Sequence, residues 1–173
     1  MENKKVEKNI FFIGFMGVGK STMARIVSKE LDRTLVEMDE TIEEEAKMSI
    51  NEIFDTYGEE YFRDLESALV ERIADHGGMI VSCGGGAVLR EKNVENMKKN
   101  GVIIFLSATP ETIYQRVRYS KNRPLLNGNM NVEFIAKLME RRREVYEKAA
   151  DVIISTTGKE KKQIIQEILE HCV

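Results

Sequence analysis

The sequence predicts an α/β fold in which a five-stranded parallel sheet carries helices on both of its faces. Short apolar runs alternate along the chain with longer segments whose apolar residues recur at helical spacing, and this alternation is typical of a parallel sheet. The length of 173 residues suits one domain with a single core. We therefore expect one domain over residues 1–173, with ligands bound beyond the carboxyl ends of the strands.

The five expected strands are short apolar runs at residues 9–13, 34–38, 79–82, 102–106 and 152–154. Apolar residues at helical spacing follow the first strand, at Met23, Ile26, Val27 and Leu31. Further helices are expected over most of 39–75, with breaks near Ser49 and Gly58, and over 109–119, 132–149 and 161–172. Residues 121–131 are rich in Asn and contain Pro and Gly, which predicts a loop.

Composition and charge narrow the range of partners. The formal net charge is −3, so we expect neither nucleic acid nor an anionic membrane as a partner, and no apolar run is long enough to span a bilayer. The two cysteines, Cys83 and Cys172, lie far apart in the sequence, which favours a reducing cytoplasm over a disulfide scaffold. The two histidines lack partners at metal-ligand spacing, so any metal should be a hard ion held by oxygen.

A phosphate-binding motif follows the first expected strand. Residues 14–21 read Gly-Phe-Met-Gly-Val-Gly-Lys-Ser and fit the P-loop pattern G-x-x-x-x-G-K-[ST], between an apolar strand and an amphipathic helix. Its glycines let backbone N–H groups surround phosphate oxygens, while Lys20 would reach the β- and γ-phosphates and Ser21 would bind Mg²⁺. The alternative is a glycine-rich turn with a chance Lys-Ser. The residues expected to contact ATP here are Gly17, Val18, Gly19, Lys20, Ser21 and Thr22.

The residues around the P-loop favour a small-molecule kinase over other P-loop proteins. No N/T-K-x-D guanine motif is present, and the strands that end in Ser82 and Ser107 lack the Asp of motor-type ATPases. Carboxylates instead lie next to the end of the second strand, at Glu37 and Asp39. A kinase needs carboxylates near both its acceptor hydroxyl and its Mg²⁺. Side chains alternate along an extended segment, so we expect both acids to face the cleft. The alternative for Asp39 is a solvated helix N-cap.

Glycines and arginines in unusual places indicate an acidic acceptor. Gly84, Gly85 and Gly86 follow the third strand, where they would let a ligand approach the backbone or would simply form a turn. Arg142 occupies a position on the buried stripe of its helix, and a buried guanidinium needs an anion, either a structural carboxylate or a ligand. Arg63 can pair with Glu66, three residues further along the helix. The pair is either a surface ion pair that contributes little stability, or it orients Arg63 to bind a carboxylate of the acceptor.

Basic residues gather around the expected loop at 121–131. Arg116, Arg118, Lys121 and Arg123 could form a lid, over about residues 116–131, that brings cations onto the transferring phosphoryl group and excludes water. A solvated basic loop is the alternative.

Taken together, the motifs resemble those of the shikimate kinase family over nearly the whole chain. The motifs that carry the resemblance are the P-loop, Met38-Asp39, Tyr61-Phe-Arg-Asp-Leu-Glu66, Gly84-Gly-Gly-Ala-Val88, Arg123-Pro-Leu-Leu126, and Arg142 four residues before Tyr146. The resemblance implies a P-loop fold of the nucleoside-monophosphate-kinase type. It also implies transfer of the ATP γ-phosphoryl group to the 3-hydroxyl of shikimate in aromatic amino-acid synthesis.

The resemblance also implies roles for individual residues. An acceptor-binding segment is expected over about residues 39–66. The residues that match shikimate contacts in the family are Asp39, Arg63, Gly84, Gly85, Gly86 and Arg142.

Nucleotide contacts follow from the resemblance in the same way. Lys20 and Arg123 match phosphate contacts, and Arg116 matches a residue beside the adenine. Ser21 matches a Mg²⁺ ligand, and Ser82 a contact to the metal through water. Lys20 and Arg123, together with Asp39 at the acceptor hydroxyl, are therefore the expected catalytic residues.

The chain departs from the family at one site position. The family usually has Asp-x-Asp after the second strand, whereas this chain has Glu37-Met38-Asp39. The longer Glu37 should still reach a metal-bound water.

Two rival functions stay open on the sequence. One is another small kinase, acting on gluconate or a nucleotide, since gluconate is also a hydroxy acid. The other is a nucleotide-dependent binding module without turnover, although Lys20, Ser21, Asp39 and Arg123 are all intact. We expect a monomer.

Overall fold

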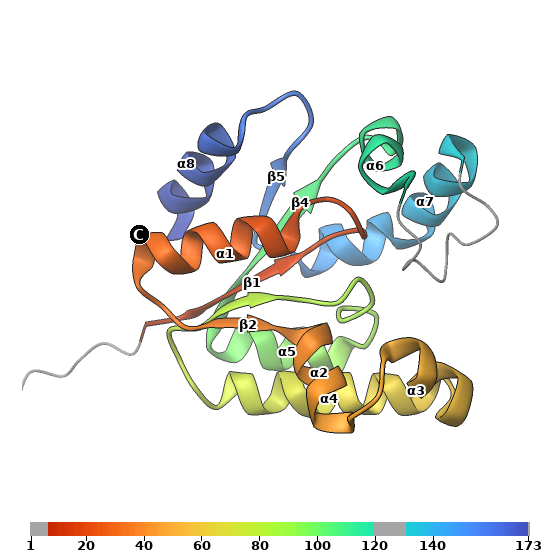
Figure 1. The fold of residues 1–173 in the computed structure, drawn as a ribbon. Coiled ribbons are helices and arrows are strands. Elements are labelled where there is room, and N and C mark those ends of the chain that lie inside the picture. Colours follow the sequence, from red (N-terminus) through yellow and green to blue (C-terminus); the bar gives the residue numbers. More distant parts are fainter. Residues whose placement is uncertain (1–6, 120–130, 173) are drawn as a thin grey trace, which may run out of the picture.

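A computed structural model describes residues 7–119 and 131–172 and contains the expected five-stranded parallel sheet (Figure 1). Its strand order is β2-β3-β1-β4-β5. The strands are β1 (Asn9–Ile13), β2 (Leu35–Glu37), β3 (Ile80–Ser82), β4 (Gly101–Ser107) and β5 (Val152–Ser155). All five strands predicted from apolar runs are confirmed, with ends that agree to within one residue.

Helices cover both faces of the sheet (Figure 1). They are α1 (Lys20–Leu31), α2 (Met38–Ala46), α3 (Ile50–Tyr57), α4 (Glu59–Ala74), α5 (Glu91–Lys99), α6 (Pro110–Val117), α7 (Val132–Ala149) and α8 (Lys161–Cys172). α1 and α8 pack together on one face, while α5 and α7 contact β4 from the other and α4 packs against α5. α2 and α3 extend from α4 at one end of the molecule.

The breaks expected near Ser49 and Gly58 are where α3 begins and ends. The Ser49 side chain accepts a hydrogen bond from the backbone N–H of Glu52 at 3.1 Å and caps α3. Gly58 has a φ of 86°, which favours glycine, and the chain turns there from α3 into α4. Residues 39–75 therefore form three helices, which carry the acceptor-side residues.

α5 is a helix that the sequence pattern did not predict. Two of its buried side chains are the amides of Asn93 and Asn96, beside the buried Met97. Polar residues at core-facing positions hide the apolar period that marks an amphipathic helix. The Asn93 side chain is bonded to the backbone instead, donating to the carbonyl oxygen of Ala87 at 2.9 Å.

The register of the central strands brings the site residues to one edge of the sheet. Phe12 of β1 lies beside Ser82 of β3, and Ser82 lies beside Glu37 of β2. Phe11 and Phe12 are fully buried, as expected for a central strand covered on both faces. Because the strands are parallel, the P-loop after β1 and the polar ends of β2 and β3 meet at the same edge.

Part of the basic loop predicted at 121–131, including Arg123, lies outside the described residues. Its last residue, Asn131, caps α7 by accepting a hydrogen bond from the N–H of Phe134 at 2.8 Å. In the described part of the chain, every helix is too short or too polar to cross a membrane.

Candidate active site

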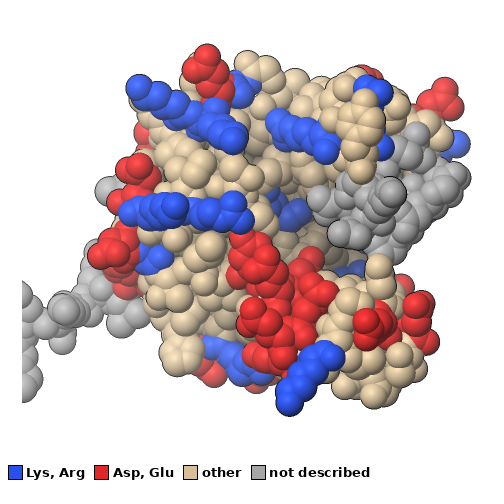
Figure 2. Space-filling view, viewed as in Figure 1, with Lys and Arg blue, Asp and Glu red and all other residues tan. Residues whose placement is uncertain are grey.

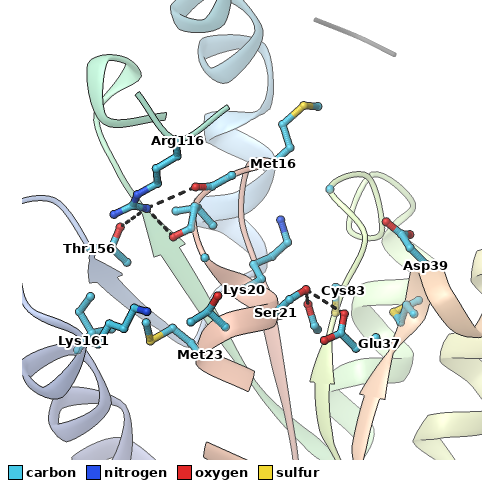
Figure 3. A pocket seen from close by; sticks show the side chains of 18 of the residues that line it. Met16, Lys20, Ser21, Met23, Glu37, Asp39, Cys83, Arg116, Thr156 and Lys161 are labelled. Carbon is cyan, nitrogen blue, oxygen red and sulfur yellow. Dashed lines mark hydrogen bonds between the residues drawn. The ribbon is translucent and has the colours of Figure 1, made fainter. Parts of the chain in front are cut away.

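A cavity of about 590 Å³ opens beyond the carboxyl ends of β1, β2 and β3. The P-loop forms one wall, the start of α2 another, and the segment between β5 and α8 a third. Figure 2 shows the molecule hollowed here, with basic side chains around the hollow and acidic side chains gathered over α2. Figure 3 shows the Lys20 side chain extending into this cavity and Asp39 at its opposite side. Lys20 and Asp39, the two expected catalytic residues in the described part of the chain, therefore line the same cavity.

The P-loop has the tight conformation that its glycines predict. Gly17 has a φ of 79°, and a side chain there would run into Val117 of α6. The Lys20 ammonium group donates to the carbonyl oxygens of Gly14 at 2.6 Å and Phe15 at 3.1 Å. The loop leads straight into α1, whose N-terminal N–H groups face the cavity, as a phosphate site requires.

Three oxygen-bearing side chains meet where α1 begins. The Ser21 hydroxyl donates to Oε2 of Glu37 at 3.0 Å and lies 3.2 Å from the Ser82 hydroxyl (Figure 3). Arg25, one turn further along α1, lies 3.6 Å from the other oxygen of Glu37. In the described residues no group of three His, Cys, Asp or Glu side chains could hold a metal alone. The Ser21–Glu37–Ser82 set fits Mg²⁺, which takes a few protein oxygens together with water and phosphate.

Asp39 lies on α2 and not on an extended segment, so the alternation argument made from the sequence is wrong. β2 ends at Glu37, and Asp39 is the second residue of the following helix. Both acids still line the cavity, because the chain turns from strand to helix between them. Asp39 faces Gly84 and Glu66, whereas Glu37 faces Ser21. The two carboxylates therefore serve different parts of the cavity.

Arg63 and Glu66 form a buried pair on α4, so the surface ion-pair alternative is wrong. Nη1 of Arg63 lies 3.1 Å from Oε1 of Glu66, and their side chains are only 13% and 1% exposed. Arg63 also reaches Glu59 at 3.3 Å. Within the described residues, Oε2 of Glu66 has no hydrogen-bond partner. Burial raises the pKa of the Glu66 carboxyl above its ordinary value, and the Arg63 guanidinium opposes that shift.

Each of the three glycines after β3 makes room for a charged side chain. A Cβ on Gly84 would meet Asp39 and Glu66 at 2.7 and 3.0 Å, and one on Gly85 would meet Arg142 at 3.2 Å. A Cβ on Gly86 would overlap the Arg63 guanidinium. The turn alternative accounts for part of this segment, since Ala87 N–H bonds to Gly84 O. The glycines bring four charged groups against one short stretch of backbone.

Arg142 is half-buried, and not fully buried as its place on the apolar stripe of α7 predicted. Its guanidinium lies against Gly85, as does the Tyr146 side chain, whose hydroxyl donates to Gly85 O at 2.5 Å. The Arg142 charge also acts on the buried Glu66 carboxyl, where it opposes the rise in pKa that burial causes. Both a structural carboxylate and a ligand therefore stay open as partners of Arg142, whose guanidinium faces the backbone at Gly85.

Arg116 ties the P-loop to the end of β5. Its Nη1 donates to the carbonyl oxygen of Val18 at 2.9 Å and lies 3.4 Å from Gly17 O and from the Thr156 hydroxyl (Figure 3). The structure thus places Arg116 at the cavity, on the side away from Asp39.

Comparison with known proteins decides the family. The shikimate kinase family model matches residues 16–173. A shikimate kinase from Thermodesulfovibrio yellowstonii is 39% identical over 163 residues, which is 94% of each chain. The chain belongs to the shikimate kinase family. A solved structure described as shikimate kinase from Acinetobacter baumannii in complex with shikimate is 30% identical, with a TM-score of 0.89 over 95% of this chain and 92% of that one.

Membership of the shikimate kinase family makes the chain an enzyme that phosphorylates shikimate, as the resemblance implied. The nucleoside-monophosphate-kinase type of P-loop fold is confirmed with it. A gluconokinase from Sinorhizobium meliloti is only 15% identical, with a TM-score of 0.56 over 96% of this chain and 92% of that one. That likeness shows the fold alone, so it gives no support to gluconate as the acceptor.

Several cavity residues of this shikimate kinase family member were missed in the sequence. They are Met16, Met23, Cys83, Thr156, Lys159, Lys161 and Ile164. Thr156 and the residues after it follow the carboxyl end of β5, and that position was the available signal. Burial raises the pKa of the Cys83 thiol, in keeping with a small residue at a strand end and not a catalytic thiolate.

Proposed function

We propose that the chain transfers the γ-phosphoryl group of ATP to the 3-hydroxyl of shikimate. The observation that carries this proposal is that a phosphate-binding loop and a set of charged acceptor residues lie together at the ends of neighbouring strands. The loop is the P-loop after β1, and the acceptor residues are Asp39, Arg63 and Arg142 around the glycines after β3. A kinase needs this pairing, because its catalytic power comes mostly from positioning two substrates and stabilising charge.

The nucleotide side of the proposal rests on the P-loop. The N–H groups of residues 17–22 would bind the ATP phosphates, and Lys20 would move from its carbonyl partners to the β- and γ-phosphates. Arg116 would hold the P-loop carbonyls and lie beside the adenine. Arg123, outside the described residues, is proposed as a further phosphate contact on the resemblance alone.

The acceptor side rests on two guanidinium groups and one carboxylate. Arg63 and Arg142 lie against adjacent glycines, Gly86 and Gly85, so they can approach one carboxylate together. A guanidinium binds a carboxylate through two parallel hydrogen bonds, which fixes orientation as well as charge. Asp39, across Gly84, would accept a hydrogen bond from the attacking hydroxyl and take up its proton.

Ser21 and Glu37 are proposed to hold Mg²⁺, with Glu37 and Ser82 acting through water. When bound, the metal supplies positive charge to the β- and γ-phosphate oxygens. The proposed location is the cytoplasm, which supplies ATP, and the proposed state is a monomer. Sedimentation velocity with and without substrates tests the oligomeric state, and a concentration-dependent dimer would contradict it.

A coupled ADP-release assay with shikimate, gluconate and AMP as separate acceptors tests the proposed function. We expect turnover with shikimate and background rates with the other two. The Asp39→Asn variant, assayed in parallel, is the control for ADP release that does not depend on the acceptor. Equal turnover with gluconate, or ADP release without any acceptor, would contradict the proposal.

Calorimetry tests the two arginines. Arg63→Ala and Arg142→Ala should each weaken shikimate binding by roughly 2–5 kcal/mol and leave ATP binding nearly unchanged, since each removes one partner of a charge pair. Arg143→Ala is the matched control, because Arg143 is exposed on the same helix and pairs only with Glu140 among described residues. Equal losses for both substrates would indicate structural damage and would remove the assigned roles.

A further inference from the structure

The stretch of residues 83–90 after β3, which we call the glycine segment, runs from the cavity to the start of α5. Its first half carries the three glycines that touch charged side chains. Its second half turns back through a hydrogen bond from Leu89 N–H to Gly86 O and ends at Arg90, the residue before α5. The glycine segment therefore lies between the acceptor residues and Arg90.

Arg90 fastens the end of the glycine segment to α4. Its Nη1 donates to Asp64 Oδ1 at 2.9 Å and to Ser67 Oγ at 3.1 Å, and its Nη2 donates to Glu60 Oε1 at 3.0 Å. Positions 60, 64 and 67 share one face of a helix, so a single guanidinium spans almost two turns of α4. The Arg90 side chain is 31% exposed, which leaves this fork partly shielded from water.

The separation between the glycine segment and α4 decides where the Arg63 guanidinium can lie. Arg63 and Glu66 lie on α4 among the three positions that Arg90 contacts, and the Arg63 guanidinium fills the space in front of Gly86. If the segment moved away from α4, Arg63 would lose the wall that limits its rotamers. A guanidinium that binds a planar carboxylate through two bonds depends strongly on such placement.

We infer that Arg90 is a positioning residue for the acceptor: it clamps the glycine segment to α4 and so places Arg63 for the substrate carboxylate. This inference rests on the proposed function, in which Arg63 binds shikimate. It adds a residue that contacts no substrate and lies outside the motifs that marked the family.

Steady-state kinetics of Arg90→Ala test the inference. We expect the KM for shikimate to rise roughly tenfold and the KM for ATP to stay unchanged. The tenfold figure lies between the small effect of losing a surface ion pair and the about hundredfold cost of displacing a group by 1 Å. Arg90→Lys keeps the charge but not the fork, and it should recover only part of the loss. The Arg90 side chain makes no capping bond to α5, so these changes remove no capping bond from that helix.

Arg72→Ala is the matched control. Arg72 lies on α4 too and forms an exposed two-bonded pair with Glu45, but it is nine residues from Arg63, roughly 13 Å along the helix. Its loss should leave both KM values unchanged. A double variant of Arg90→Ala with Asp64→Ala should add little to Arg90→Ala alone, because both changes break the same clamp.

Two results separate the inference from the proposed function beneath it. If Arg63→Ala raises the KM for shikimate but Arg90→Ala acts no more strongly than Arg72→Ala, the clamp is overturned and the acceptor role of Arg63 stands. If Arg63→Ala itself leaves the KM for shikimate unchanged, the acceptor assignment is overturned as well. A parallel rise in both KM values for Arg90→Ala would indicate general loosening and would also overturn the inference.

Discussion

The Lys20 ammonium group lies beside backbone oxygen atoms of the P-loop at the start of α1. It is bonded to two P-loop carbonyls, those of Gly14 and Phe15. An ammonium group offers three donors, and it can exchange backbone oxygens for phosphate oxygens without moving far. The residue thus carries its charge at the place where the phosphates are proposed to bind.

The Lys20→Met variant should retain the fold and lose catalysis. Methionine keeps an unbranched chain of similar length but brings no charge to the developing phosphoryl oxygens. Removal of one such donor usually costs about 10²–10³-fold in kcat. Single-turnover assays measure the loss, and thermal unfolding checks the fold. A rate within a few-fold of wild type would show that Lys20 does not stabilise the transition state.

Asp39 and Glu37 should differ in kcat and in metal dependence. The amide of Asp39→Asn keeps the shape but cannot take up the hydroxyl proton, so kcat should fall by about 10²–10⁴-fold at every Mg²⁺ concentration. Glu37→Gln should raise the Mg²⁺ requirement, because the oxygen that accepts from Ser21 loses its charge. Glu37→Asp should be nearly silent if Glu37 acts through water.

A Mg²⁺ titration of kcat for the three acid variants separates these roles. The result expected is a lowered plateau for Asp39→Asn and a shifted midpoint for Glu37→Gln. The reverse pattern, with Glu37→Gln inactive at saturating Mg²⁺ and Asp39→Asn almost normal, would mean that the two roles are exchanged.

At the scale of elements, the glycine segment and α4 form one unit of the acceptor side. Gly84 and Gly86 give the side chains of α2 and α4 access to the backbone after β3. Neither glycine has a positive φ, so the reason for glycine here is space and not backbone conformation. A larger residue at either position would therefore displace the neighbouring charged side chains without straining the backbone.

Gly86→Ala tests whether Gly86 is needed to leave space for the Arg63 guanidinium. Its methyl group would displace the Arg63 guanidinium, which is the far end of a flexible side chain, so stability should change little. The KM for shikimate should rise by about tenfold or more, while the KM for ATP should not change. In an Arg63→Ala background the same substitution should have little further effect on KM. An equal effect in both backgrounds would show that Gly86 contacts the substrate directly.

The order of elements was largely predictable, and the failures have local causes. Buried parallel strands are continuous apolar runs, so all five could be found. α7 and α8 were predicted to the residue, because apolar residues recur along them at helical spacing. α5 could not be found, since Asn93 and Asn96 face its buried side. Asp39 was assigned to an extended segment, although β2 ends two residues earlier.

At the scale of the whole molecule, Glu66 links the acceptor site to global stability. Its carboxyl is almost fully buried, and burial raises its pKa above the ordinary value of 4.5. A raised pKa means that the folded state holds the proton more tightly than the unfolded chain does. The stabilising contribution is therefore fully present below about pH 4.5 and is lost as the pH rises through the folded-state pKa.

Glu66→Gln removes this titration and provides the test. Urea unfolding of both proteins from about pH 4 to about pH 8 should show the wild type losing stability relative to the variant as pH rises. The Arg63 guanidinium opposes this trend without reversing it. A constant difference across that range, or one that grows in favour of the wild type, would show that the Arg63 charge outweighs burial.

The sequence by itself determined the fold class, the P-loop and the family. These depend on residues close together in the chain, where spacing alone fixes which groups face a phosphate or a core. Asp39, Arg63 and Arg142 could also be predicted from the sequence as acceptor-binding residues. Each is a charged residue that interrupts an apolar pattern or belongs to a motif of the family.

Only the tertiary structure decided how those candidates meet. Gly84 faces Asp39 and Glu66, Gly85 faces Arg142, and Arg90 reaches back to α4. These contacts join segments that are tens of residues apart, and they depend on how helices pack over the sheet and how tightly the backbone can approach them. No periodicity or spacing in the sequence encodes such distances, because they are set by the packing of the whole core.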